Sequence, residues 1–162
     1  MEQNKVVKII PCSKKAEGIA ITQDGSEIWV TNIQDNFISV INTNTYKTTA
    51  RLETGIQPLR IEFSIDGRHC LVSNASDGTV SVFNTKSKQL VKNIALPGSK
   101  NLAEKLMYGT PRPVGILMHP NGKYAFVSNY TAGIVEVIDM LNFKCEGRIP
   151  VGNMPDGLAL IN

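Results

Sequence analysis

Short apolar stretches alternate with polar turns along the whole chain of 162 residues. Between residues 59 and 97, four runs rich in β-branched residues are separated by turns such as Asp66-Gly67 and Ser76-Asp77-Gly78. Short runs of this kind, bounded by Asp-Gly and Asn/Ser turns, are typical of strands in an antiparallel meander. The pattern therefore predicts four consecutive strands here, which we call A to D.

The same pattern occurs three times. Asp24 and Asp66 are 42 residues apart, and so are Asn32 and Asn74. From the second copy to the third the offset is 55 residues, as from Asn74 to Asn129, which indicates a single insertion. A four-stranded unit that repeats at such a period is typical of a β-propeller blade, in which the sheets pack face to face around an axis.

We therefore expect an all-β fold, a single partial β-propeller domain over residues 1–162 made of four-stranded antiparallel blades. The expected blades cover about residues 17–55, 59–97 and 114–150. Half-repeats at 5–10 and 155–162 are expected to be terminal strands of a further blade or blades. A closed propeller needs about four to eight blades. Either the chain is a segment of a longer propeller, or copies of it associate to complete one.

Each copy of strand B ends in a similar tripeptide. The three versions are Val30-Thr31-Asn32, Val72-Ser73-Asn74 and Val127-Ser128-Asn129. With the preceding Asp-Gly or Asn-Gly turn, this pattern resembles the YVTN-type repeat of YncE-like β-propellers. Departures are Ala16 where later copies have proline and Arg60 where other copies have glycine. The resemblance implies a propeller fold and a periplasmic or extracellular full-length parent, while members of this family differ in activity.

Positions at which the copies differ are candidates for a binding site, because structural demands are shared by all copies. At the entry to strand A the equivalents are Glu17-Gly18, Leu59-Arg60, Val114-Gly115 and Asp156-Gly157. Strand A lines the channel of a propeller, so Glu17, Arg60 and Asp156 are expected to ring one mouth, with Arg112 close by. Arginine binds carboxylate or phosphate bidentately, which favours an anionic or polar ligand. The alternative is an ion-pair network that only shapes the channel.

The insertion, about residues 98–109, lies between strand D of the second blade and strand A of the third. Leu102 and Leu106 have i,i+4 spacing, which predicts a short helix. A long loop on a rigid face is a usual place for recognition, although it could also be a tolerated surface excursion. Tyr108 and Tyr130 are expected to add aromatic surface to the same face.

Charge and composition argue against several classes of function. The net charge of +3 is spread over the chain, so no dense basic face for nucleic acid is expected. No apolar run approaches the ~20 residues of a membrane span, and residues 1–5 lack the apolar core of a signal peptide. The three cysteines occupy non-equivalent positions without metal-ligand spacing. We therefore expect neither a disulfide framework, nor a metal site, nor a cofactor.

These features favour a non-catalytic binding scaffold whose partner is a small anionic ligand or a protein. The alternative, implied by the family resemblance, is a lactonase-like hydrolase or part of one. In that case the Glu17 and Asp156 carboxylates at the mouth of the channel would bind a metal.

Overall fold

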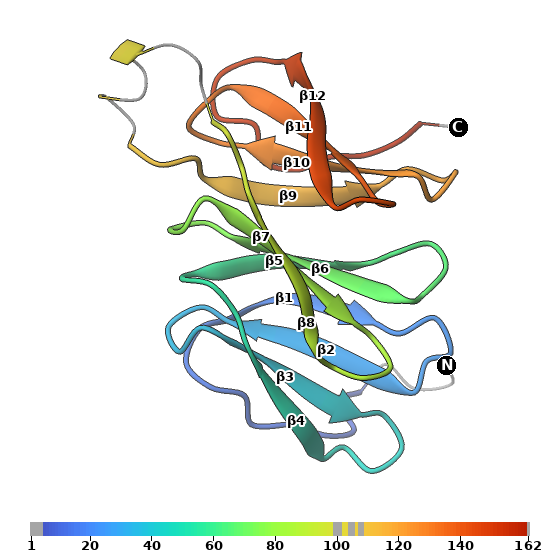
Figure 1. Ribbon diagram of the computed structural model, residues 1–162. Coiled ribbons are helices and arrows are strands. Elements are labelled where there is room, and N and C mark those ends of the chain that lie inside the picture. Colours follow the sequence, from blue (N-terminus) through green and yellow to red (C-terminus); the bar gives the residue numbers. More distant parts are fainter. Residues whose placement is uncertain (1–4, 99–101, 104–105, 107–108, 162) are drawn as a thin grey trace.

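The computed structural model in Figure 1 describes residues 5–98, 102, 103, 106 and 109–161. Within these residues, three four-stranded antiparallel sheets form the protein. The first contains β1 (Ala16–Ile21), β2 (Glu27–Asn32), β3 (Phe37–Asn42) and β4 (Thr48–Glu53). The second contains β5 (Pro58–Phe63), β6 (His69–Asn74), β7 (Thr79–Asn84) and β8 (Leu90–Ala95). The third contains β9 (Pro113–Met118), β10 (Tyr124–Asn129), β11 (Ile134–Asp139) and β12 (Lys144–Pro150).

Within each sheet the strands follow one another in chain order, so each sheet is a meander of strands A to D. The sheets are stacked face to face, and β5 lies between β1 and β9 (Figure 1). This arrangement confirms the predicted fold class: the chain is an all-β segment of a β-propeller with three blades. We call the sheets blades 1, 2 and 3.

The hydrophobic core lies between the blades. Trp29 and Val40 of blade 1 pack with Phe63 and Val72 of blade 2, and the Trp29 and Phe63 rings meet edge to face with centres 5.3 Å apart. Leu71, the neighbour of Val72 on β6, faces blade 3 instead. Because successive side chains of a strand point to opposite faces, a central blade needs apolar residues on both. This explains why the strands of blade 2 contain consecutive apolar residues such as Leu71 and Val72.

The Thr or Ser at the end of each strand B links two blades. In blade 1, the Gly18 N–H donates to Thr31 Oγ1 (2.8 Å), and the Thr31 hydroxyl donates to the Leu59 carbonyl of blade 2 (3.0 Å). The same relay occurs at Arg60–Ser73–Val114 and at Gly115–Ser128–Asp156. The repeated Val-Thr/Ser-Asn pattern therefore encodes the contact between successive blades.

The asparagines that follow these residues in blades 1 and 3 hold the loops that enter those blades. The Asn32 side-chain oxygen accepts the Ser13 N–H (3.0 Å), and the Asn129 oxygen accepts the Arg112 N–H (3.1 Å). The Asn32 amide also donates to the Phe37 carbonyl across the B-to-C turn (3.2 Å). All three strand-B asparagines are buried, and the Asn74 amide of blade 2 donates to the Ser81 hydroxyl (2.8 Å). These contacts assign the three asparagines a structural role.

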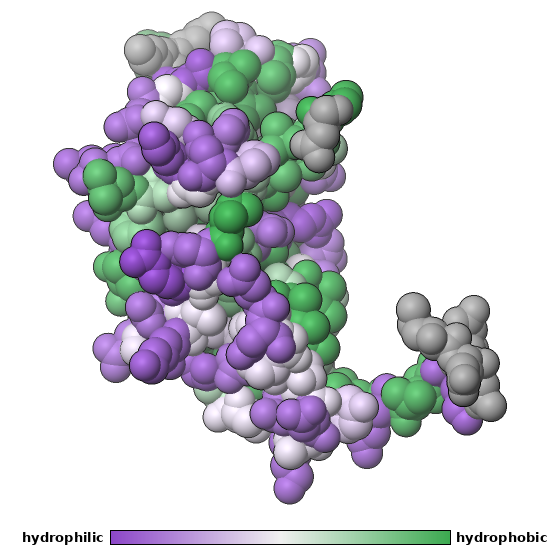
Figure 2. All heavy atoms as spheres, turned by 90° about the vertical axis from the view of Figure 1, so that its right-hand side faces the viewer, coloured by the Kyte–Doolittle hydropathy of each residue, from purple (hydrophilic) through white to green (hydrophobic). Residues whose placement is uncertain are grey.

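The two terminal segments differ from the blades. Residues 5–13 and 155–161, where half-repeats are expected, form no strand within the described part of the chain. A strand needs a neighbour for its backbone hydrogen bonds, and here neither segment has one beyond isolated contacts. The N-terminal segment projects from the body (Figure 2), and its apolar residues, such as Val6, are exposed.

The insertion between β8 and β9 is helical at Leu102, Ala103 and Leu106, in agreement with the short helix predicted there. Both leucines are exposed. In the described residues, no helix is long and apolar enough to cross a membrane.

Candidate functional site

The predicted mouth brings Glu17 of β1 and Arg60 of β5 together. Arg60 Nη1 donates to Glu17 Oε1 at 2.5 Å, and both side chains are partly exposed. Each residue lies where the pairing of strand A with strand B shifts register, between Ala16 and Ile19 and between Pro58 and Ile61. Such bulges redirect side chains out of the regular alternation, and here they bring two charges from neighbouring blades into contact.

Arg112 and Tyr130 form a second pair on the same side of the blades. The Arg112 guanidinium carbon lies 5.8 Å from the Tyr130 ring centre, within range of a cation–π contact. The Tyr130 hydroxyl lies 3.2 Å from Met154 Sδ. The Arg112 guanidinium thus lies against an aromatic face and forms no ion pair within the described residues.

Asp156 contacts blade 3 through its backbone, because its carbonyl accepts a hydrogen bond from the Ser128 hydroxyl at 2.7 Å. Its carboxylate forms no hydrogen bond or ion pair within the part of the chain that the structure describes. Tyr108 lies outside the described residues. The predicted ring therefore consists of two contacting pairs and one free carboxylate, and none of the contacts above joins the pairs to each other.

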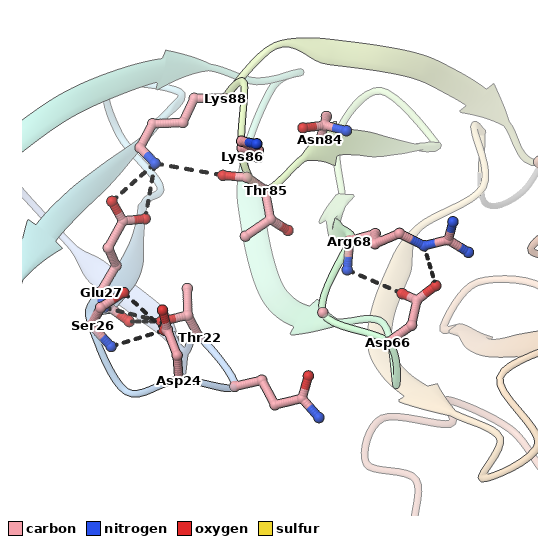
Figure 3. A pocket seen from close by; sticks show the side chains of 12 residues that line it. Thr22, Asp24, Ser26, Glu27, Asp66, Arg68, Asn84, Thr85, Lys86 and Lys88 are labelled. Carbon is pink, nitrogen blue, oxygen red and sulfur yellow. Dashed lines mark hydrogen bonds and ion pairs between the residues drawn. The ribbon is translucent and has the colours of Figure 1, made fainter.

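A larger cleft lies between blades 1 and 2 at the opposite edge, where strand A turns into strand B (Figure 3). Its volume is about 810 Å³. Lys88 Nζ lies 2.9 Å from Glu27 Oε1 across this cleft, and the Trp29 indole N–H donates to Glu27 Oε2 at 3.0 Å. Sequence reasoning missed this cleft, because its residues come from turns that are far apart in the chain.

The two aspartates that line this cleft form hydrogen bonds within the turns to which they belong. Asp24 accepts hydrogen bonds from the Ser26 N–H and from the Thr22 and Ser26 hydroxyls, which lower the pKa of its carboxyl to about 2. Asp66 is bonded to Ser64 and Arg68 in the same way, and its pKa is also lowered to about 2. The hydroxyl residue two positions before each aspartate was the sequence signal for this structural role.

A second cleft of about 470 Å³ lies on the same edge between blades 2 and 3, lined by His69, Lys123, Tyr124 and others. The His69 ring packs edge to face on Phe143, with ring centres 5.0 Å apart. Partial burial lowers the pKa of this histidine. His69 therefore serves as a packing residue at this cleft.

Glu136 is a fully buried acid at a position where the other blades have Ser39 and Ser81. Its Oε1 accepts the Asn129 amide at 3.4 Å, and its Oε2 lies 3.3 Å from Arg148 Nε without an aligned hydrogen bond. Burial raises the pKa of Glu136, and Arg148 offsets only part of this rise.

We expect Glu136 to make stability depend on pH. Because the folded-state pKa lies above the ordinary value of 4.5, the folded protein retains a proton that the unfolded chain has lost. The free energy of unfolding should therefore fall as pH rises from about 4.5 through the folded-state pKa. Urea unfolding between pH 4.5 and 7 should show a smaller fall for Glu136→Gln. An identical pH dependence in the two proteins would contradict this assignment. Asp24 and Asp66 affect stability only below this pH range, because their carboxyl groups have a pKa of about 2 in the folded protein.

Among the described residues, no group of three or more His, Cys, Asp or Glu side chains is placed to hold a metal ion. The mouth can instead offer guanidinium N–H donors to an anion, and Tyr130 can offer an aromatic face.

No protein-family model and no curated protein sequence matches this chain. Among solved structures, hydrazine synthase of Kuenenia stuttgartiensis is similar, with a TM-score of 0.77 and 23% identity. The similarity covers 97% of this chain but only 41% of that chain. At this identity, the similarity shows the propeller fold and leaves the activity open. The chain spans less than half the length of the solved structure that it matches.

Proposed function

We propose that this chain is a non-catalytic β-propeller scaffold of the YVTN type, which binds an anionic ligand or partner at the mouth formed by the entries to strand A. The three hydroxyl relays that join the blades support the assignment to this repeat type, since they use the Thr or Ser of the Val-Thr/Ser-Asn pattern. The periplasmic or extracellular location of a full-length parent is part of the same proposal.

The exposed Glu17–Arg60 pair carries the proposal. Arg60 stands where blades 1 and 3 have Gly18 and Gly115, and its backbone N–H makes the same contact to strand B as the glycines do. The fold therefore has no need of the Arg60 side chain. A partly exposed surface ion pair contributes little to stability, typically about 0–1 kcal/mol, so its role is sought in binding.

An anion fits this mouth better than a cation. Within the described residues Arg60 uses only Nη1, on Glu17, so its remaining N–H groups can donate to a carboxylate or phosphate. Arg112 adds a second guanidinium group, positioned on the Tyr130 ring. Two guanidinium groups, together with the acceptor oxygens of the Glu17 and Asp156 carboxylates, suit a polar anion that also donates hydrogen bonds.

Replacing Arg60 by glycine tests this proposal. We expect Arg60→Gly to retain the circular dichroism and unfolding midpoint of the parent protein, because glycine occupies this position in the other blades. Binding of citrate or inorganic phosphate, measured by isothermal titration calorimetry, should weaken at least tenfold, since a lost charge-assisted hydrogen bond is worth about 1.5–3 kcal/mol. The matched control is Arg68→Gly, which removes an exposed arginine from the opposite edge.

Equal affinity in Arg60→Gly and the parent protein would contradict a site at Arg60. The absence of binding of either anion to the parent protein would contradict an anionic small-molecule ligand.

A lactonase-like hydrolase remains the alternative. It would need a metal or a general base at the mouth, and the Glu17 carboxylate already binds Arg60. Elemental analysis of the purified protein distinguishes the scaffold from the hydrolase, because a stoichiometric divalent ion would favour the hydrolase.

A further inference from the structure

The outward face of blade 1, which points away from blade 2, is apolar and open. Ile19 and Ile21 of β1 are 67% and 57% exposed. Their equivalents in blade 2, Ile61 and Phe63, are 5% and 9% exposed, and Met118, the equivalent of Ile21 in blade 3, is 5% exposed. In blades 2 and 3 the preceding blade covers these positions. The open face therefore has the side chains of a blade-to-blade interface.

A backbone acceptor lies on the same face. The carbonyls of Leu59, Val114 and Asp156 each accept the hydroxyl of a Thr or Ser from the preceding blade. The equivalent carbonyl in blade 1 is that of Glu17, and no hydroxyl of another blade reaches it within the described residues. A blade whose strand B ends in Val-Thr/Ser-Asn would supply both the apolar cover and the missing donor.

The other end of the stack offers the complementary face. Phe126 and Val137 of blade 3 are partly exposed, whereas their equivalents in blade 2, Leu71 and Val82, are fully buried. Ser128 of this blade donates its hydroxyl to Asp156. That residue belongs to a C-terminal segment that forms no strand in the described residues.

This C-terminal segment occupies the place of a strand A. Pro155-Asp156-Gly157-Leu158 is equivalent to Ala16-Glu17-Gly18-Ile19 in the repeat. The Asp156 carbonyl lies against Gly115 as the Leu59 carbonyl lies against Gly18. The segment thus holds the position that β1 of another chain can take.

We propose that two copies of this chain associate head to tail, with blade 1 of each copy packed on blade 3 of the other. In this dimer the Glu17 carbonyl replaces the Asp156 carbonyl as acceptor for the Ser128 hydroxyl. Two sets of three blades give six, within the range of about four to eight that closes a propeller. A head-to-tail interface that closes in this way produces a discrete dimer instead of a filament. The proposal is independent of which ligand binds at the mouth.

The test is the mass of the full chain in solution, measured by sedimentation velocity over a hundredfold range of concentration. We expect exchange between a species of 17.7 kDa and one of twice that mass. Ile21→Lys places a charge on the open face and should weaken the dimer at least tenfold. Ile56→Lys is the matched control, because Ile56 is equally exposed, at 56%, but lies in a loop between blades 1 and 2. Circular dichroism is the check that both variants are folded.

A further variant ends at Met154 and so removes the segment that competes for Ser128; it should dimerise more tightly. Three results would overturn the proposal. They are a monomer at every concentration, assemblies that grow beyond a dimer, and equal weakening by Ile21→Lys and Ile56→Lys.

Discussion

Replacing Trp29 by alanine is expected to lower the free energy of unfolding by about 3–5 kcal/mol, the usual cost of removing a large aromatic side chain from a core. Trp29 is 0% exposed and fills the interface between blades 1 and 2. Its ring meets Phe63 edge to face, and its N–H donates to Glu27. The substitution therefore leaves a cavity between two sheets and removes the indole donor from Glu27.

Urea unfolding followed by circular dichroism measures this effect, because the variant lacks the single tryptophan of the chain and with it the intrinsic fluorescence probe. Leu141→Ala is the control. Leu141 is 86% exposed in a turn, so its loss should change stability by no more than about 0.5 kcal/mol. A cost below about 1 kcal/mol for Trp29→Ala would show that blades 1 and 2 are not packed as described.

Gly18→Ala is expected to destabilise the protein by about 1–3 kcal/mol, the usual range for overpacking. An alanine Cβ at this position would lie 2.3 Å from the Leu59 carbonyl oxygen and 3.2 Å from the Arg60 Cα. Both atoms belong to the backbone of blade 2, so the relief of the clash requires the two blades to separate. The Thr31 relay, which passes through the same point, would be stretched as well.

The matched control is Gly157→Ala. Gly157 occupies the same position of the repeat, but in the described part of the chain no atom beyond its sequence neighbours lies within 4 Å of an added Cβ there. Urea unfolding should therefore show a loss for Gly18→Ala and little change for Gly157→Ala. Equal losses would mean that the glycine is required by the local backbone and not by the neighbouring blade.

The blade strands were predictable because their signals are local. The Asp66-Gly67 turn and the β-branched runs beside it correspond to the turn between β5 and β6 and to the strands themselves. The terminal segments have similar composition but form no strand in the described residues. The amino-acid composition of a segment favours an extended backbone, but a β-strand also needs a neighbouring strand for its backbone hydrogen bonds.

The candidate site was predictable in part. The repeat alignment places Glu17 and Arg60 at neighbouring positions of the repeat in adjacent blades, where strand A begins, and the structure brings them into contact. It could not tell that the Arg112 guanidinium lies within cation–π range of the Tyr130 ring, because that contact depends on the path of two loops. The Glu27–Lys88 contact across the larger cleft joins residues 61 positions apart, with no shared motif.

By itself, the sequence determined the blades, their order and the residues that each repeat shares, because turn chemistry and strand preference act over a few neighbouring residues. Only the tertiary structure decided which faces are covered. Ile19, Ile61 and Ile116 are identical residues at one position of the repeat, yet only Ile19 is exposed. Burial depends on the blade that packs against a face, and no local pattern contains that blade.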